Sequence, residues 1–370
     1  MFSTNYVRST ELALEGIQNG VIPGGLRHTD MGAPGVYWPS GEPCLGSRLA
    51  QTPELRPHST LSTSDVLALK PERVSGDALY AGYLKPTFGH VLVEGTSRLW
   101  WALERGFDGP IIFDCPVGNP LRFPYIRRLL GMMGLLERIR VPRDPLRFDR
   151  VYVPEQAYKI RTEVHPKFHN AFRLAVDTLT PKPRANTGRP IYLSRTKLTR
   201  ALIVGEYLAE QAFERAGFQI VHPQLLELDE QIRLIIQAPA VAGFIGSAMH
   251  NLLFGMCPKQ TICLHGTRDK NLSNFIMIDQ LLGNDATYVI GARNELALGH
   301  GGPYLFDHER AFDLLEQAGI LRRKCRPLFS RDDLTRAYTA EWHRRKKIIQ
   351  NRKQSKTKLS TADEYADDDI

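Results

Sequence analysis

The segment RPIYLSRTKLTR, residues 189–200, starts a run of alternating strand and helix patterns that continues to residue 264. Apolar strand patterns occur at 191–193, 219–221, 241–245 and 260–264. Helix patterns occupy 205–215 and 248–254, with a further helix capped by Asp229. Strands that alternate with helices predict right-handed crossovers and a parallel sheet covered on both faces. We therefore expect an open α/β sheet, which binds ligands beyond the carboxyl ends of its strands.

A second α/β pattern precedes the first. Its helix patterns occupy 89–105, 124–133 and 168–179, and its strand patterns occupy 110–114, 138–141 and 150–153. The linker 180–188 is rich in Pro and Gly, which is typical of a domain boundary. We expect an irregular N-terminal arm over 1–60, one α/β domain over 61–183, a second over 184–330, and a basic helix with an acidic disordered tail over 331–370.

Composition narrows the class of protein. The chain has 370 residues, of which 42% are hydrophobic, so it can bury a large core. No apolar run approaches the roughly 18 residues needed to cross a bilayer, and no secretory signal is visible. Its five cysteines are scattered, without the paired spacing of zinc or redox sites. These features predict a cytoplasmic protein with reduced thiols.

Much of the net charge of +8 is concentrated near the C-terminus. The basic residues there are Arg344, Arg345, Lys346, Lys347, Arg352, Lys353, Lys356 and Lys358, and acidic residues follow from Asp363 to Asp369. A solvated helix that frays into disorder is one interpretation, and docking on an anionic membrane is another. The tract lacks interleaved aromatic residues beyond Trp342, so nucleic acid is not an expected partner.

Basic residues and a glycine turn follow two strands of the downstream unit. Arg195 and Arg200 come just after the strand at 191–193, where guanidinium groups can hold phosphate oxygens. The backbone N–H groups of residues 247–249 begin a helix after Gly246, and a helix N-terminus favours an anion. Together these features predict an anion site. The alternative is a surface arginine near an ordinary turn.

In the upstream unit, His90 and Glu94 lie four residues apart near the start of a helix, so their side chains share one face. Either group could remove a proton from a hydroxyl. The alternative is structural, with His90 capping the helix and Glu94 pairing with Arg98.

Several familiar motifs are missing from the chain. There is no phosphate loop ending in Gly-Lys-Ser/Thr, no Gly-x-Gly-x-x-Gly after a strand, no serine elbow and no His-Glu-x-x-His helix. Their absence disfavours a nucleoside triphosphatase, a dehydrogenase, a lipase-like hydrolase and a zinc protease. An Asp-x-Asp occurs only in the acidic tail, so no metal site is assigned.

These motifs resemble those of glycosyltransferase family 61. The family's His-x-x-x-Glu helix corresponds to His90 and Glu94, and its Ser-Arg segment corresponds to Ser194 and Arg195. Further matching residues are Arg200, Glu206, Gly217, Phe218, Glu230, Gln231, Gly246, Ser247, Ala248, His250, Asn251 and Phe254. Two positions depart from the pattern. Ile245-Gly246-Ser247 stands where many members have His-Gly-Ala, and Gly205 replaces the Asn of an Asn-Glu pair. The turn with His250 after it is similar to bacterial capsular-polysaccharide members.

The resemblance implies a GT-B architecture, in which two Rossmann-like domains with parallel sheets face each other across a cleft. The first would hold the acceptor and the second the nucleotide-sugar. It also implies an inverting transfer that needs neither a metal nor another cofactor. Glu94 or His90 would deprotonate the acceptor, while Arg195, Arg200 and the Gly246 turn stabilise the leaving nucleotide.

The residues expected to contact the nucleotide-sugar are Arg195, Arg200, Glu206, Glu230, Gln231, Gly246, Ser247, Ala248, His250 and Asn251. For Glu206, Glu230 and Gln231, the alternative is a structural role at helix starts.

The function expected from this resemblance is transfer of a sugar from a nucleotide-sugar donor to a glycan or lipid-linked saccharide in surface or capsular polysaccharide biosynthesis. The basic C-terminal tract would place this cytoplasmic enzyme at the inner, anionic face of a membrane. The alternative is a non-catalytic nucleotide-sugar-binding or polysaccharide-assembly protein.

Overall fold

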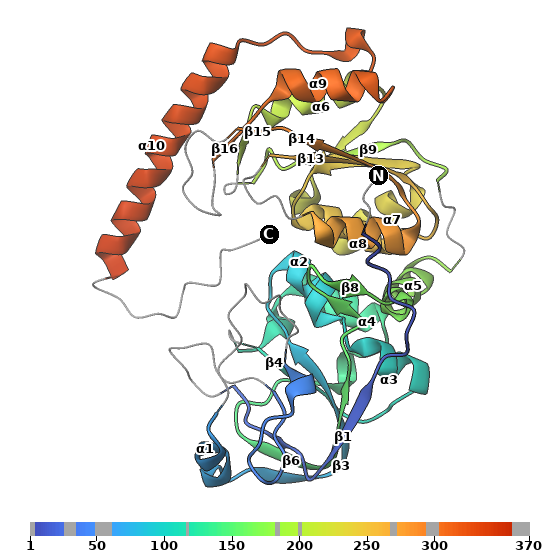
Figure 1. Ribbon diagram of the computed structural model, residues 1–370, viewed down its shortest axis with the longest axis vertical. Helices are drawn as coiled ribbons and strands as arrows, with labels where there is room; N and C mark the ends of the chain where they lie inside the picture. The colour runs from blue at the N-terminus through green and yellow to red at the C-terminus, as the bar shows by residue number, and fades with distance from the viewer. Residues whose placement is uncertain are drawn as a thin grey trace. The chain divides into compact units, whose positions relative to one another are not determined.

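The computed structural model describes residues 4–25, 35–48, 61–115, 118–181, 186–198, 202–266, 272–293 and 303–356. Its contacts divide the chain into two compact units. Unit 1 comprises Met1–Lys182 and Leu272–Leu281, and unit 2 comprises Pro183–Asn271 and Leu282–Ile370. Figure 1 shows the elements of each unit. None of the described helices combines the length and apolar content needed to cross a bilayer.

Unit 2 contains the parallel sheet that the segment 189–264 predicts. Its strands are β9 (Ile191–Leu193), β11 (Gln219–Val221), β12 (Ala240–Phe244), β13 (Gln260–His265) and β14 (Asp285–Ile290). Their order is β11-β9-β12-β13-β14, and every neighbouring pair is parallel. The strand order reverses between β9 and β12, so the topological switch point of this doubly wound sheet lies there.

Helices cover both faces of this sheet. Helices α6 (Glu206–Arg215) and α9 (His308–Gln317) lie on one face, and α7 (Leu228–Gln237) lies on the other (Figure 1). Gly217, with φ +95°, supplies the expected left-handed end of α6. The expected cap of α7 by Asp229 is wrong. Glu227 is the N-cap, and it forms a capping box with Glu230.

A small second sheet and a long helix complete unit 2. The sheet contains β10 (Ile203–Val204), β16 (Tyr304–Phe306) and β15 (Ala292–Arg293), in that order. Helix α10 (Arg331–Lys356) buries Leu334 and Tyr338 in the same core as α6 and α9. The basic helix expected within 331–370 is therefore present as α10, whereas residues 357–370, where the acidic tail is expected, lie outside the described residues.

Unit 1 is built on a mixed sheet, not on the wholly parallel sheet expected. Its strands are β1 (Leu14–Gln18), β2 (Val21–Ile22), β3 (Glu72–Tyr83), β4 (Ile111–Asp114), β5 (Ile139–Arg140) and β6 (Leu146–Pro154). The order is β1-β6-β3-β4-β5, with β2 also beside β6. The pairs among β3, β4, β5 and β6 are parallel, whereas β1 and β2 run antiparallel to β6.

The segment expected as an irregular arm thus contributes strands to this sheet. Ile17 and Ile22 are fully buried in the core of unit 1. Val36 and Cys44 pack in the same cluster. The sequence around these residues is rich in Gly and Pro. Strand β1 pairs with β6, which lies more than a hundred residues later in the chain. A local apolar pattern does not reveal such a pairing.

Helices of unit 1 include α1 (Thr63–Ala68), α4 (Pro124–Met132), α5 (His169–Leu179) and α8 (Ser273–Leu282). The long helix expected over 89–105 is broken into α2 (Phe88–His90), a π-helical turn η2 (Val91–Gly95) and α3 (Leu99–Arg105). Strands β7 (Tyr158–Lys159) and β8 (Glu163–Val164) form a hairpin. Short 3₁₀ helices within the described ranges occur at Leu45–Ser47, Pro120–Arg122, Leu136–Arg138, Pro166–Phe168, Pro223–Leu225, Ser247–Phe254 and Arg323–Cys325.

Candidate functional site

The C-terminal ends of β9 and β12 lie side by side at the switch point of unit 2. Leu193 on β9 is the register partner of Gly243 on β12. Two residues further along, Arg195 Nη1 donates a hydrogen bond to the carbonyl oxygen of Ile245, at 3.1 Å. A Cβ atom at Gly246 would lie 3.0 Å from the same nitrogen. The absence of a side chain at Gly246 therefore lets the guanidinium lie against the turn.

A buried carboxylate supports the loop that carries Arg195. Glu206, in the first turn of α6, is 2% exposed. Its Oε1 accepts hydrogen bonds from the backbone N–H of Arg195, at 2.8 Å, and from the hydroxyl of Tyr192, at 3.4 Å. Burial raises the pKa of Glu206 to about 7, although the hydrogen bond from Arg195 acts in the opposite direction. These contacts make Glu206 a positioning residue for Arg195.

A second carboxylate, which sequence reasoning missed, holds the side chains of the same loop. Glu210 Oε1 accepts hydrogen bonds from the hydroxyl groups of Ser194 and Thr196, the latter at 2.7 Å. The backbone N–H of Thr196 donates to Ser194 Oγ at 3.1 Å. The sequence spacing could have indicated this role, because Glu210 follows Glu206 by four residues and lies on the same face of α6.

The turn at Gly246 leads into η7 (Ser247–Phe254), so the helix expected over 248–254 is present and has 3₁₀ geometry. The N–H of Met249 donates to the carbonyl oxygen of Gly246 at 3.0 Å. Of the three N–H groups expected to face an anion, this one is therefore already used. His250 is 8% exposed, and its Nδ1 lies 3.3 Å from the carbonyl oxygen of Ser247. Anion binding by the backbone N–H groups of Ser247 and Ala248 stays a prediction.

The other expected nucleotide contacts have protein partners. Asn251 Nδ2 donates to Gln231 Oε1 at 2.9 Å, and Gln231 Nε2 donates to two backbone carbonyls of the preceding loop, both at 3.0 Å. Glu230 accepts from the N–H of Glu227 at 3.2 Å. These contacts correspond to the structural alternative for Glu230 and Gln231. Arg200 lies outside the described residues.

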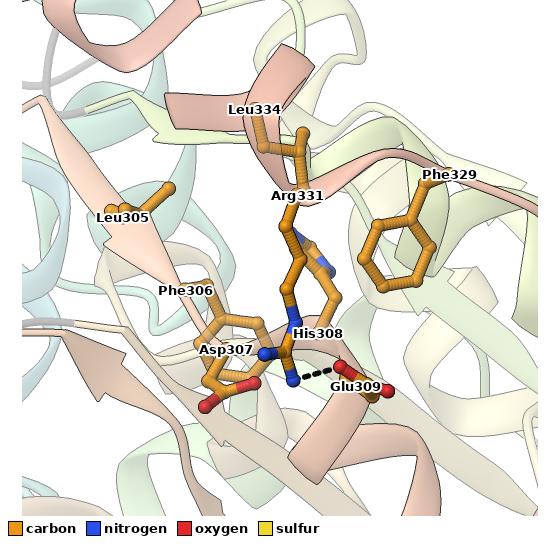
Figure 2. Close-up of a pocket in the computed structure, with 8 residues that line it drawn as sticks. All are labelled: Leu305, Phe306, Asp307, His308, Glu309, Phe329, Arg331 and Leu334. Atoms are coloured by element: carbon orange, nitrogen blue, oxygen red, sulfur yellow. Dashed lines mark ion pairs between the residues drawn. The ribbon is translucent and has the colours of Figure 1, made fainter. Parts of the chain in front are cut away.

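The segment just before Glu206 packs against His308 and neighbouring aromatic side chains. His308 is buried, and its Nε2 lies 3.2 Å from the carbonyl oxygen of Val204. This ring lines a cavity of about 10 Å³ together with Phe306, Phe329 and Leu334. Figure 2 shows these side chains and the ion pair between Arg331 and Glu309. That volume holds about one water molecule, so the region is a packing contact.

Gly205 fits against this ring only because it lacks a side chain. Its φ is +85°, and a Cβ there would lie 2.7 Å from His308 Nε2 and 2.8 Å from Leu334 Cδ2. The packing explains the glycine at the position where the family pattern has Asn.

In unit 1, His90 and Glu94 meet as their spacing predicts. His90 Nδ1 and Glu94 Oε2 form a hydrogen bond across the π-helical turn. The His90 side chain is 38% exposed and that of Glu94 is 11% exposed, so the imidazole is the accessible group. Irregular π-helical turns often occur at functional sites.

Arg98 contacts backbone carbonyl groups in place of the ion pair with Glu94 that the structural alternative predicts. Its guanidinium is buried and donates to the carbonyl oxygens of Pro154 and, at 2.9 Å, of Arg48. Burial lowers the pKa of Arg98 to about 10. Arg98 therefore ties together backbone segments of unit 1 that are distant in the sequence.

The described structure is a mixed α/β fold with parallel sheets, an architecture consistent with a glycosyltransferase. Residues 88–264 match the family model Glycosyltransferase 61, and this range contains His90, Glu94, Arg195, Glu206 and the Gly246 turn. The match supports the expectation that the protein is a glycosyltransferase. A comparison with curated proteins found no match. Within the described ranges, no three His, Cys, Asp or Glu side chains gather into a group that could hold a metal ion.

Proposed function

We propose that the protein transfers a hexosyl or pentosyl group from a nucleotide-sugar to a glycan or lipid-linked saccharide in surface or capsular polysaccharide biosynthesis. The position of Arg195 beside the Gly246 turn, at the switch point of unit 2, carries this proposal. Doubly wound sheets bind ligands at this point, and a guanidinium with backbone N–H groups suits a diphosphate. In the GT-B arrangement that we propose, unit 2 binds the donor and unit 1 binds the acceptor.

The His90–Glu94 pair supports a role for His90 as the base. Glu94 engages Nδ1, so Nε2 is the nitrogen that would accept the proton of the acceptor hydroxyl. The acceptor oxygen then bonds to the anomeric carbon as the bond from that carbon to the diphosphate oxygen breaks, with inversion. The electron pair leaves with the nucleoside diphosphate. Arg195 and the N–H groups of Ser247 and Ala248 would stabilise its charge without a metal.

A membrane contact through α10 belongs to the same proposal. The helix buries Leu334 and Tyr338 against unit 2, whereas Arg344, Lys346 and Lys347 are exposed. Each basic residue near an anionic leaflet adds about 1 kcal/mol of attraction. Such a contact would place a cytoplasmic enzyme at the inner face of the membrane, where lipid-linked acceptors lie.

A thermal-shift screen against UDP, GDP, CMP and their sugar derivatives tests the donor site, because a ligand of the folded state raises Tm. We expect one nucleotide family to raise Tm in the wild type and not in Arg195→Ala. Arg189→Ala is the matched control, because Arg189 lies at the opposite end of β9 and is exposed. No shift with any nucleotide would overturn the proposal. Binding without sugar transfer or donor hydrolysis would instead identify a non-catalytic binding protein.

A further inference from the structure

Unit 1 contains a groove with a volume of about 970 Å³. The C-terminal end of α3, the loop before β4, and residues of β3 and β6 line it. Three aromatic side chains contribute to the lining, those of Trp101, Phe107 and Tyr152. Among the described residues that line the groove, neither His90 nor Glu94 occurs. The groove is therefore separate from the proposed base.

Backbone irregularities open the groove. The pairing of β3 with β6 shifts register between Val74 and Asp77, and Gly76 in this bulge has φ +95°. The N–H of Gly76 donates to Asp149 Oδ2 at 2.7 Å, which fixes the bulge. Gly106 ends α3 with φ +60°. A Cβ at either glycine would meet no heavy atom within 4 Å, so both positions face open space. Bulges of this kind are frequent beside functional sites.

The three rings form one cluster. The centroid of Trp101 lies 4.6 Å from that of Tyr152 and 5.4 Å from that of Phe107. Trp101 is 8% exposed, whereas Phe107 and Tyr152 are half-buried and present part of their rings to the groove. Arg150, two residues before Tyr152 on β6, also holds this ring, because Arg150 Nη1 donates to the Tyr152 hydroxyl at 3.0 Å. The groove thus has a preformed aromatic surface.

Polar groups surround these rings. Asp77, Arg105 and Asp108 line the groove together with the hydroxyl-bearing Ser75. Their charges are of both signs, which favours a neutral polar ligand over a strongly anionic one. A sugar ring has apolar C–H faces and a rim of hydroxyl groups. Aromatic rings suit the faces, and carboxylate, guanidinium and hydroxyl groups suit the rim.

We infer that this groove is a second saccharide-binding site, which holds neutral sugar units of the acceptor chain away from the site of transfer. Its volume of about 970 Å³ is comparable to that of small-molecule sites, and an open groove of this size accommodates a chain of about two or three sugar units. That the bound sugar belongs to an acceptor rests on the proposed function. The presence of a saccharide site rests on the groove itself.

Saturation-transfer NMR on the full chain, with cellobiose, xylobiose and N,N′-diacetylchitobiose as probes, tests the inference. We expect at least one disaccharide to bind the wild type, and Tyr152→Ala to weaken that binding about tenfold. Arg105→Ala is a second variant that does not depend on core packing, because Arg105 is exposed. Arg127→Ala, exposed on α4, is the matched control and should bind as the wild type does.

Two results would overturn the inference: no binding of any of the three probes, or equal binding by the wild type, Tyr152→Ala and Arg105→Ala. The nucleotide screen on the same proteins separates the two proposals. Nucleotide binding without saccharide binding would remove the groove site alone. Saccharide binding that depends on Tyr152, without nucleotide binding, would remove the proposed function alone.

Discussion

The backbone N–H of Arg195 donates a 2.8 Å hydrogen bond to the carboxylate of Glu206, which is 2% exposed. This bond joins the loop after β9 to the first turn of α6. Because the carboxylate is buried, its protonation and the position of the loop are linked.

Glu206 should make stability depend on pH. Burial raises its pKa from 4.5 to about 7, so between these values the folded chain holds a proton that the unfolded chain has lost. Stability therefore falls as pH rises through this window, by about 3 kcal/mol in total. Glu206→Gln keeps an acceptor for Arg195 and removes the titration. We expect a flatter dependence of the free energy of unfolding on pH, measured by urea denaturation, with nucleotide binding retained.

Glu206→Ala is the contrasting variant. It leaves the Arg195 N–H and the Tyr192 hydroxyl without their acceptor, which should cost about 1–3 kcal/mol and weaken nucleotide binding. If Glu206→Gln and the wild type showed the same pH slope, the buried carboxylate would not be the titrating group.

Gly205→Ala should destabilise unit 2 more than Gly217→Ala. Both residues have positive φ, but a Cβ at Gly205 would collide with His308 and Leu334, whereas one at Gly217 meets nothing within 4 Å. Left-handed backbone alone costs roughly 1–2 kcal/mol for a non-glycine residue, and the overpacking adds about 1–3 kcal/mol. Chemical denaturation of the two variants measures the difference. Equal losses would mean that the His308 contact is not rigid.

His90→Ala should lower kcat by about 10²–10⁴-fold and leave donor binding unchanged, because general-base catalysis supplies a factor of that size. Glu94→Gln should cause a smaller loss of kcat, because Glu94 only orients the imidazole through the hydrogen bond to Nδ1. Turnover is measured with the nucleotide-sugar that the screen identifies. A His90→Ala enzyme with full activity would exclude His90 as the base.

Asp114 should add a second pH dependence, in unit 1. Its carboxylate is buried and accepts hydrogen bonds from the Tyr80 hydroxyl at 2.6 Å and the Gly35 N–H at 2.9 Å. Burial, the dominant effect, raises the pKa of Asp114 from 3.8 to about 6, so stability falls as pH rises across that range. Asp114→Asn should remove this dependence, which amounts to a change of about 3 kcal/mol in the free energy of unfolding.

The matched control is Asp144→Asn, at an exposed position of the same unit. Thermal melts from pH 4 to pH 7 should show a flatter curve for Asp114→Asn only. A flattened curve in both variants would point to general surface charge instead.

Replacing Lys346 and Lys347 with alanine should weaken binding to vesicles containing phosphatidylserine by roughly 10–30-fold, because each lysine contributes about 1 kcal/mol. Sedimentation with anionic and with neutral vesicles measures the effect. Arg322→Ala and Arg323→Ala, exposed before α10, make a control pair of equal charge. Unchanged sedimentation of the lysine variant would remove the membrane contact from the proposal.

Structural features that depend on residues close together in the chain could be predicted from the sequence. The apolar runs of β9, β12 and β13 predicted a parallel sheet, and Gly217 marked the end of α6. The spacing of His90 and Glu94 placed both side chains on one face. By contrast, β3 was missed because Ser75 and Gly76 interrupt its pattern at a bulge. The antiparallel pairing of β1 with β6 joins distant segments and left no local signal.

By itself, the sequence determined the alternation of strands and helices and the residue types at the strand ends, because backbone periodicity and capping act over a few residues. Only the tertiary structure decided which of those residues face solvent and which support others. It placed Arg195 against Ile245, fifty residues away, buried Glu206 beneath the loop, and tied Gln231 to Asn251. Burial and long-range pairing depend on the whole packed core, so no local pattern could assign these roles.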